Sequence, residues 1–433
     1  MCPHGAYDVK IAVAMQCKLE PFLHKKPLVG IFGAGLSGKG AANLCKALHW
    51  SYELLDEQEA QSPRFESYGL CIFSPGFAPH HPWRIQAQRA HALCVNELDF
   101  AATCFTNPII AVTGTNGKTS VTELMAQLLR DNGQEALSVG NNGRVLSQAV
   151  ADAALSDQGV YVCEVSSFQA ASLQWFRPMC TLWTNFAPDH LDYHGGLKEY
   201  FLAKYHLLTL TDGPCICGPN LREWMEHFGV SCPTLQFVEP DAVNNQSLTQ
   251  FPNSFSYGQR ENFALIQTYA RLKGIDDAIV AHCLTHFKQA PHRLHCCCKT
   301  DTMAFWNDSK GTNLHAVKAA LESLKHLPHL HWILGGGGKG EALQGFIDLL
   351  NAYPIEQIYL VGETGEQLFE QAHQFHAPVQ HCKRLEQVFI QLPQNEPFNL
   401  VLSPGFTSWD QFKSYAERGD LFERLAQQYI AAS

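Results

Sequence analysis

The chain has 433 residues, of which 46% are hydrophobic, 17% are charged and 11% are aromatic. At ~150 residues per domain this length predicts about three domains, and the composition excludes a disordered, collagen-like or coiled-coil protein. The 31 lysine and arginine residues against 41 aspartate and glutamate residues give a formal net charge of -10, which disfavours general nucleic-acid binding.

The cysteines and the hydropathy of the chain bear on its compartment. Sixteen cysteines occur at irregular spacings, and we expect reduced thiols of a cytoplasmic protein rather than a disulfide framework. The run Cys296-Cys297-Cys298 has no CxxC partner, so no structural zinc site is expected. No stretch approaches the ~20 apolar residues of a membrane span, so membrane insertion is not expected either.

The first clear element is an apolar strand predicted at residues 28–32, followed by a glycine turn and a helical pattern through Leu48. The turn at 33–38 has the form GxGxxG, and Asp56 follows at about the distance expected of a ribose-binding acid. Such a turn requires only a close approach of the backbone to a phosphate. A nicotinamide dinucleotide and a UDP group therefore both fit it, and a purely structural tight turn is the alternative.

The second segment of this kind carries the strongest motif. A strand at 109–113 leads into Gly114-Thr-Asn-Gly-Lys118 and then into a helical pattern over 121–130. The N–H groups of such a turn form an anion cradle, Lys118 adds a mobile positive charge, and the hydroxyl of Thr119 can hold Mg²⁺. The phosphates of a nucleoside triphosphate suit this geometry, although Val112 stands where the general P-loop pattern has its first glycine.

Further polar positions follow predicted strands of the middle region. Glu164 is the single acid of the buried strand that begins at Tyr161, and it is either an oxygen ligand for a hard cation or a structural cap or lysine partner. Asp189, His190 and Asp192 cluster after the strand at 180–183. Lys204 lies in a helical pattern over 200–208, and spacing alone indicates an ordinary solvated lysine.

The last third repeats the strand and glycine-turn pattern. A strand at 331–334 runs into Gly335-Gly-Gly-Gly-Lys339, and later strands are predicted at 357–361 and 399–402. Strands that alternate with helices predict an α/β fold with parallel sheets, with candidate seams at 96–108 and 289–291. Ligands bind at the carboxyl ends of such strands, where polar segments occur at 291–293, 306–313 and 403–412.

Taken together, these segments resemble the ATP-dependent Mur ligase family, in the branch that adds D-glutamate. The resemblance covers about residues 28 to 424. Its motifs are GTNGKTS at 114–120, EVSSFQ at 164–169, PDHLD at 188–192, APHR at 290–293, WNDSKGTN at 306–313, GGGGK at 335–339 and SPGFTSWDQF at 403–412.

The resemblance implies three domains: a Rossmann-like UDP-sugar-binding domain at 1–97, a P-loop-type central ATPase domain at 98–289, and a Rossmann-like amino-acid-binding domain at 290–433. It implies a cytoplasmic, monomeric ligase of peptidoglycan precursor synthesis. The enzyme would use ATP and Mg²⁺ to join D-glutamate to UDP-N-acetylmuramoyl-L-alanine through an acyl phosphate.

The resemblance also assigns residues to ATP and metal. Lys118 would contact the β and γ phosphates, Thr119 and Glu164 would hold one Mg²⁺, and His190 would hold a second together with Lys204. Because an ammonium group cannot bind a cation, Lys204 would act as a carbamate formed with CO₂. The ATP-contacting positions would be Gly114, Thr115, Asn116, Gly117, Lys118, Thr119, Ser120, Asn262, Arg293 and Asp308.

The remaining assignments concern the two substrates. Positions for the UDP-muramoyl substrate would be Leu36, Ser37, Asp56, Ser74, Pro75, Gly76, Asn141, Ser166 and His190. Positions for D-glutamate would be Asp189, Lys310, Thr312, Lys339, Ser408 and Tyr415. Glu57 and Gln58 follow Asp56 where the family often has Thr and Arg, so a positive charge is missing there.

Two other functions remain open from the sequence. One is another amino-acid ligase of the same family, although the L-alanine-adding member usually has a GxGGxGM-like opening and a histidine-rich P-loop, and the DNPR motif of the diaminopimelate-adding member does not occur here. A nicotinamide-dependent oxidoreductase would explain the GxGxxG turn, but it would leave the segments at 114–120 and 306–313 without a role.

Overall fold

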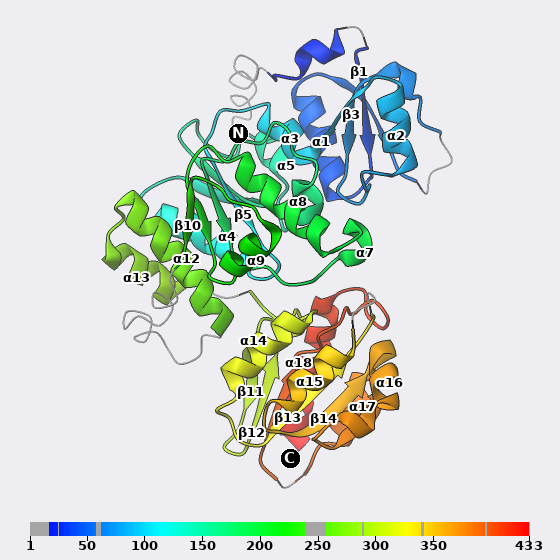
Figure 1. Cartoon of the computed structure of the whole chain (residues 1–433), viewed down its shortest axis with the longest axis vertical. Helices are drawn as coiled ribbons and strands as arrows, with labels where there is room; N and C mark the ends of the chain where they lie inside the picture. Colours follow the sequence, from blue (N-terminus) through cyan, green and yellow to red (C-terminus); the bar gives the residue numbers. More distant parts are fainter. Residues whose placement is uncertain are drawn as a thin grey trace, which may run out of the picture. The chain divides into compact units, whose positions relative to one another are not determined.

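The computed structural model describes residues 17–24, 26–57, 62–238, 257–287, 290–338, 342–394 and 396–432. These residues form three sheets, and the chain divides into two compact units (Figure 1). The first unit is Met1–Val243 with Asn262–Phe287, and it holds the first two sheets. The second is Asn244–Glu261 with Lys288–Ser433, and it holds the third.

The first sheet is parallel, with the strand order β2-β1-β3-β4. Helices α1 and α2 lie on opposite faces of it (Figure 1). Phe32 pairs with both Leu55 and Phe73, so the loops after β1, β2 and β3 leave the sheet side by side, at the carboxyl ends of these parallel strands. Its elements are η1 (Glu20–Leu23), β1 (Leu28–Phe32), α1 (Leu36–Ala47), β2 (Ser51–Leu55), η2 (Phe65–Ser67), β3 (Tyr68–Phe73), α2 (Pro82–Arg89) and β4 (Leu93–Asn96).

The second sheet is also parallel, with the order β10-β9-β8-β5-β7-β6. Its inner strands β5, β7 and β8 are buried along their whole length, as their continuous apolar sequences require. Its elements are α3 (Glu97–Ala102), β5 (Ile109–Thr113), α4 (Lys118–Asp131), β6 (Ala136–Gly140), α5 (Leu146–Ala151), β7 (Val160–Glu164), α6 (Ser167–Ala170), β8 (Cys180–Trp183), α7 (Leu191–His194), α8 (Leu197–Thr209), β9 (Cys215–Cys217), α9 (Leu221–Phe228), β10 (Leu235–Phe237), α12 (Tyr257–Lys273) and α13 (Asp277–His286).

The first two sheets share one hydrophobic core. Leu44 of α1, Phe100 of α3 and Leu146 of α5 are all fully buried in it. A side-chain hydrogen bond from Asn43 Nδ2 to Gln148 Oε1, 2.7 Å long, joins α1 to α5 at its margin. The loops of the two sheets are therefore held in one compact unit.

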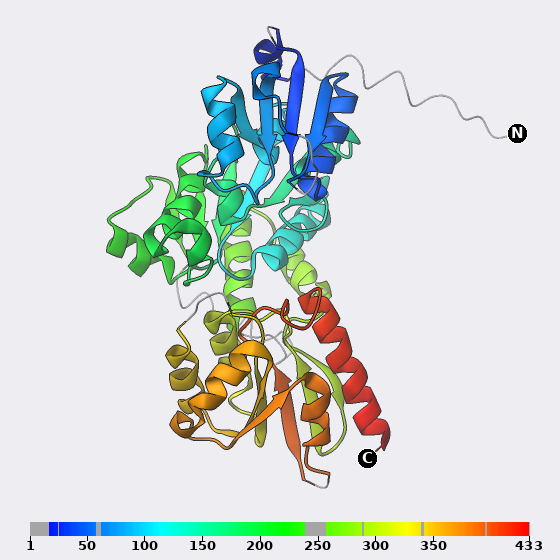
Figure 2. The ribbon, with the colours of Figure 1, turned by 90° about the vertical axis from the view of Figure 1, so that its right-hand side faces the viewer.

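The third sheet has the order β11-β12-β16-β13-β14-β15, with β11 antiparallel to β12 and the other pairs parallel. Separate cores cover its two faces, and α18 runs along the side of β11 and β12 (Figure 2). Its elements are β11 (His295–Lys299), β12 (Met303–Asn307), α14 (Leu314–Leu324), β13 (Leu330–Gly335), α15 (Gln344–Asn351), β14 (Ile355–Val361), α16 (Gly362–Glu370), η3 (Ala372–Gln374), β15 (Val379–Lys383), α17 (Leu385–Ile390), β16 (Phe398–Leu402) and α18 (Tyr415–Ala432).

The predicted α/β class with parallel sheets is confirmed, and the strands predicted at 28–32, 109–113 and 180–183 have those bounds. The antiparallel strand β11 was not expected. It contains Cys296-Cys297-Cys298 and is joined to β12 by three residues, a connection too short for a parallel crossover. The cysteines of the described residues are free thiols. None of the described helices is long and apolar enough to cross a membrane.

Candidate active site

The glycine loop between β5 and α4 lies at the carboxyl end of the central strand of the second sheet. Gly114 has φ +145°, and a Cβ there would lie 1.9 Å from Thr184 Oγ1. Gly117 has φ +83°, and a Cβ there would lie 2.5 Å from Asn262 Oδ1. Both positions therefore require glycine. Thr119 and Ser120 lie in the first turn of α4, whose leading N–H groups have no partner within the helix.

Residues that follow β8 support this loop. Asn185 accepts a hydrogen bond from the Thr115 N–H through its carbonyl oxygen, at 3.0 Å, and one from the Asn116 N–H through Oδ1, at 2.9 Å. Thr184 Oγ1 donates to the carbonyl oxygen of Asn116, at 2.5 Å. The loop conformation is thus fixed by the residues after β8, and because the Thr115 and Asn116 N–H groups donate to Asn185, the leading N–H groups of α4 are the ones left for an anion.

Two lysines contact the same carbonyl oxygen of this loop. Lys118 Nζ donates to Gly114 O at 3.0 Å and to Thr115 O at 2.8 Å. Lys204 Nζ, from α8, donates to Gly114 O at 2.7 Å. Lys204 is 1% exposed. Burial, and then the charge of Lys118, hold the pKa of Lys204 well below its usual range, against the charges of Asp189 and Glu164.

Glu164 closes the neighbouring strand β7 and is 3% exposed. Its Oε1 accepts a hydrogen bond from Asn141 Nδ2 at 3.1 Å, whereas its Oε2 is buried with no hydrogen-bond partner among the described residues. Asn142 Nδ2 lies 3.4 Å from Thr119 Oγ1. The adjacent residues Asn141 and Asn142 therefore link the two side chains that the sequence assigned to one metal ion.

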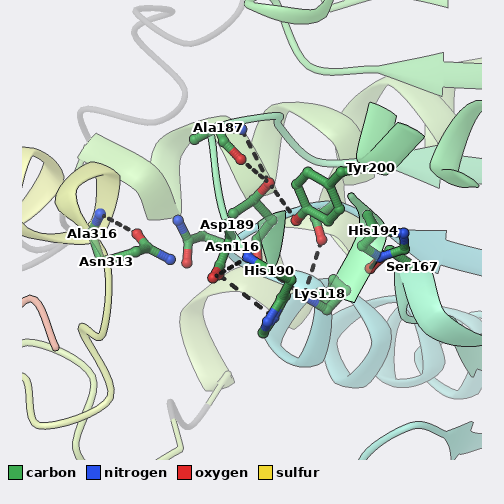
Figure 3. A network of polar contacts seen from close by, with 12 residues as sticks. Asn116, Lys118, Ser167, Ala187, Asp189, His190, His194, Tyr200, Asn313 and Ala316 are labelled. Atoms are coloured by element: carbon green, nitrogen blue, oxygen red, sulfur yellow. Dashed lines mark hydrogen bonds and ion pairs between the residues drawn. The ribbon is translucent and has the colours of Figure 1, made fainter. Parts of the chain in front are cut away.

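His190 is the N-cap residue directly before the short helix α7, and its backbone is left-handed with φ +52°. Its N–H donates to Asp189 Oδ1 at 2.9 Å, and its ring lies 4.9 Å from that of Phe168 and 6.3 Å from that of Tyr200. The Tyr200 ring also lies 4.8 Å from Lys204 Nζ. Figure 3 shows Lys118, Asp189, His190 and Tyr200 gathered beside the glycine loop.

A separate cavity of about 450 Å³ lies at the carboxyl ends of strands β1, β2 and β3 of the first sheet. Six of the residues assigned to the UDP-muramoyl substrate line it, namely Leu36, Ser37, Asp56, Ser74, Pro75 and Gly76. Asp56 Oδ2 accepts a hydrogen bond from the Ala34 N–H at 3.0 Å. Asn141 and Ser166 do not line this cavity, because Asn141 contacts Glu164 and Ser166 caps α6 through a capping box with Gln169.

In the second unit, Asp308 follows β12 and is 9% exposed. Its Oδ2 accepts a hydrogen bond from Ser403 Oγ at 2.7 Å. Burial raises the pKa of Asp308 to about 7, although Ser403 and the charges of Arg293 and Arg418 oppose the rise. Asp308 and Arg293 are therefore neighbours within this unit, and their expected contact with ATP stays a prediction.

The positions assigned to D-glutamate divide between the two units. Asp189 belongs to the first. In the second, Lys310 Nζ lies 4.9 Å from the centre of the Tyr415 ring, and Ser408 is buried at the loop after β16. Thr312 lies in the loop that joins β12 to α14. Lys339 lies outside the described residues.

Comparison with known proteins identifies the family. Residues 112–228 match the family model of the Mur ligase middle domain. A UDP-N-acetylmuramoylalanine--D-glutamate ligase from Macrococcus caseolyticus is 31% identical, over 82% of this chain and 82% of that protein. The chain belongs to the Mur ligase family. A protein of the same name from Leuconostoc mesenteroides is 28% identical, over 93% of this chain and 97% of that protein.

Solved structures of Mur ligases share the fold. The UDP-N-acetylmuramate-alanine ligase MurC of Thermotoga maritima matches with a TM-score of 0.57 at 13% identity, over 94% of this chain and 99% of that one. MurF ligase of Thermotoga maritima, solved in complex with ADP, matches with a TM-score of 0.57 at 14% identity, over 92% and 95%. These relatives are ligases, so membership of this family replaces the nicotinamide-dependent alternative.

Several residues that build the Mur ligase site were not singled out from the sequence. Tyr200, Phe168 and Asn185 contact the glycine loop or His190 only through the tertiary fold. Arg418 of α18 is 2% exposed and donates to Phe406 O, Thr407 O and Ser309 O, which joins two loops of the second unit. A signal for Arg418 existed, because it lies four residues before Phe422 on the apolar stripe of its helix.

Proposed function

We propose that this Mur ligase uses ATP to join D-glutamate to UDP-N-acetylmuramoyl-L-alanine. The observation that carries the proposal is that Lys118 and Lys204 both contact one glycine loop, while Glu164 ends the neighbouring strand of the same sheet. The names of the two curated relatives support D-glutamate as the amino acid. We also propose a monomeric, cytoplasmic enzyme with domains at 1–97, 98–289 and 290–433.

The chemistry explains why a phosphate-binding loop is needed. A carboxylate does not condense with an amine at neutral pH because it is a poor electrophile. When the carboxylate of the acceptor attacks the γ phosphorus of ATP, the bond to ADP breaks and an acyl phosphate forms. The amine of D-glutamate then attacks the acyl carbon, loses a proton and expels phosphate. Catalysis here consists of positioning and of stabilising anionic charge.

The protein groups fit a bound cation. Glu164 Oε2 is buried without a hydrogen-bond partner among the described residues, and the adjacent residues Asn141 and Asn142 contact Glu164 and Thr119 respectively. Carboxylate and hydroxyl oxygens are ligands that Mg²⁺ prefers. We therefore propose that Glu164 and Thr119 hold Mg²⁺, which would neutralise charge on the phosphates when bound. Lys118 would supply the mobile positive charge beside it.

The surroundings of Lys204 fit a carbamate. Because its pKa is held well below the usual range, the amine is disposed to be neutral, and a neutral amine is the form that reacts with CO₂. The Nζ nitrogen forms a bond to the carbon of CO₂ and releases a proton to water, which leaves one negative charge shared by two oxygens. We propose that these oxygens and His190 hold a second Mg²⁺.

The substrates are assigned to separate regions. We propose that the cavity lined by Ser37, Asp56 and Ser74 binds the UDP group. Its loops follow the carboxyl ends of parallel strands, which is where open α/β sheets bind ligands. In the second unit, Lys310, Thr312, Ser408 and Tyr415 are proposed to bind the carboxylates of D-glutamate. Lys310 and the hydroxyl groups supply the donors that a carboxylate requires.

A phosphate-release assay tests the function. The wild-type enzyme is given ATP, Mg²⁺ and UDP-N-acetylmuramoyl-L-alanine, with D-glutamate, L-glutamate, L-alanine or diaminopimelate added in turn. Phosphate should appear in step with one peptide product only with D-glutamate. Equal or faster release with another amino acid, or with UDP-N-acetylmuramate and L-alanine, would assign the enzyme to another branch of the family.

A further inference from the structure

The proposed UDP cavity has an unusual charge balance. Its described lining residues include two acids, Asp56 and Glu57, but no lysine or arginine. Asp56 Oδ2 accepts a hydrogen bond from the Ala34 N–H, and Glu57 Oε1 lies 2.6 Å from His81 Nε2. A diphosphate bound here would gain the N-terminal N–H groups of α1, yet it would meet no permanent positive charge on the described lining residues.

Arg84, in the first turn of α2, is a buried cation with no counterion among the described residues. It is 8% exposed, and its guanidinium carbon lies 4.9 Å from the centre of the Phe73 ring. Its Nε is buried with no partner, and no hydrogen bond or ion pair joins the guanidinium to any described residue. Burial of an unpaired charge is costly, and a cation against one aromatic face recovers only part of that cost.

Arg84 packs on Phe73, the residue that precedes the lining segment of the UDP cavity. Phe73 is the last residue of β3, and the chain continues from it into the lining segment 74–77. The Phe73 ring lies 5.8 Å from that of Phe77, which lines the cavity. Tyr193 Oη donates to the carbonyl oxygen of Pro75 in the same wall at 3.2 Å, and the charge of Arg84 opposes the rise that burial causes in the pKa of Tyr193.

We propose that Arg84 is the cationic partner of the diphosphate of the nucleotide that binds this cavity. The inference rests on the proposed UDP site and adds a residue that no motif in the sequence marks. A buried cation with no ion pair among the described residues is costly in the free protein, and that cost is recovered when a bound anion supplies the missing charge. Arg84 is therefore a specificity residue for phosphorylated nucleotides.

The test compares Arg84→Met with Arg89→Met, an exposed arginine of the same helix. Dissociation constants of UDP, UMP and uridine are measured by calorimetry on the full chain without ATP. For Arg84→Met the Kd of UDP should rise about tenfold or more, that of UMP less, and that of uridine by under about twofold, as a charge-assisted contact requires. Arg89→Met should leave all three Kd values within about twofold of wild type.

A second readout separates a ligand contact from a structural role. Because Arg84→Met removes an unpaired buried charge and keeps an apolar stem against Phe73, the apo protein should melt about 2 °C or more above wild type. A structural role predicts the reverse, namely a lower Tm and an equal loss of affinity for UDP and uridine, and that result overturns the proposal.

The remaining outcomes are also decisive. An unchanged Kd for UDP in Arg84→Met overturns the inference while leaving the UDP site intact. Wild-type protein that binds no UDP overturns the proposed function as well. If Arg84→Met does not fold, Arg84→Lys replaces it, and the Kd of UDP should then rise about threefold with uridine unaffected, because the charge remains but the guanidinium fork is lost. An unchanged Kd for UDP in Arg84→Lys overturns the inference.

Discussion

The two glycine loops of the first unit have the same local sequence plan and different chemical surroundings. Each follows a buried strand, precedes a helix, and contains a Gly-Lys pair, Gly38-Lys39 in one and Gly117-Lys118 in the other. Lys118 is the first residue of α4 and folds back onto its own loop. Lys39 is already one turn inside α1 and is exposed. Of the two lysines, only the one that begins its helix contacts its own glycine loop with its side-chain amine.

The glycines also differ between the loops. In the second loop, side chains from other elements block a Cβ at Gly114 and Gly117. In the first loop, a Cβ at Gly38 would meet the Gly33 carbonyl oxygen at 1.8 Å, but a Cβ at Gly35 would meet nothing within 4 Å. Gly35 therefore has no packing role in the free protein, and its missing side chain leaves room in the cavity. Gly33 of the first loop is blocked in the same way by Ser74, so the loops differ at Gly35, where the first loop leaves open space.

The largest expected effect separates the two lysines. Lys118→Ala should lower ATP-dependent phosphate release by about a thousandfold, because a charge that stabilises the phosphoryl group in transfer is lost. Lys39→Ala removes the same charge from the other loop and should leave the rate within about twofold. Phosphate release with both substrates present measures both. Comparable rates in the two variants would show that the position of the lysine in the helix does not matter.

The next effect tests the second lysine at the same loop. Lys204→Ala should lower turnover by about a hundredfold, since it removes the proposed carbamate oxygens. Short-chain carboxylic acids such as acetate should restore part of this activity by occupying the vacated space. Lys198→Ala, an exposed lysine of the same helix, is the control. Full activity in Lys204→Ala, or the same stimulation by acetate in Lys198→Ala, would eliminate the carbamate role.

A smaller effect is expected at the metal. Glu164→Gln keeps the size of the side chain but removes its charge, so the Mg²⁺ concentration at half-maximal activity should rise about tenfold. The exposed residue Glu226 provides a matched control through Glu226→Gln. A Mg²⁺ titration of phosphate release distinguishes the variants. Superimposable titration curves for Glu164→Gln and wild type would exclude Glu164 as a ligand.

The smallest effect concerns the glycine that faces the cavity. Gly35→Ala should leave the Tm within about 1 °C of wild type, because a Cβ meets no protein atom there, and should raise the KM for the UDP substrate about threefold to tenfold. The KM for ATP should not change. A KM for the UDP substrate equal to that of wild type would place the ligand elsewhere in the first sheet.

The sequence predicted the parts of the site that are local in the chain. The glycine loops at 33–38 and 114–117 and Glu164 at the end of its strand follow from motif spacing, because a strand, a turn and a helix are neighbours in sequence. The lining residues 74–76 were implied only by the resemblance to the family. The match to the family placed Asn262, and its side chain lies against Gly117. The sequence by itself indicated only a solvated Lys204, since its burial depends on the whole second sheet.

Other features arise from contacts between distant segments. No periodicity marks Tyr200, whose hydroxyl lies 3.1 Å from Thr115 Oγ1 across 85 residues. The pairing of Glu57 with His81 and the isolation of Arg84 likewise depend on how α2 packs on the first sheet. Burial and counterions are properties of the tertiary structure, so spacing could not predict them.

The carbonyl oxygen of Gly114 accepts hydrogen bonds from both lysine amines, one on each of its two lone pairs. If Lys204 takes up CO₂ as proposed, one of these two donors becomes an anion beside Lys118. Dissolved bicarbonate and the age of a buffer then become experimental variables, since degassed and air-equilibrated solutions would contain enzymes of different charge. Rates measured in the two solutions should be compared before any variant at this loop is interpreted.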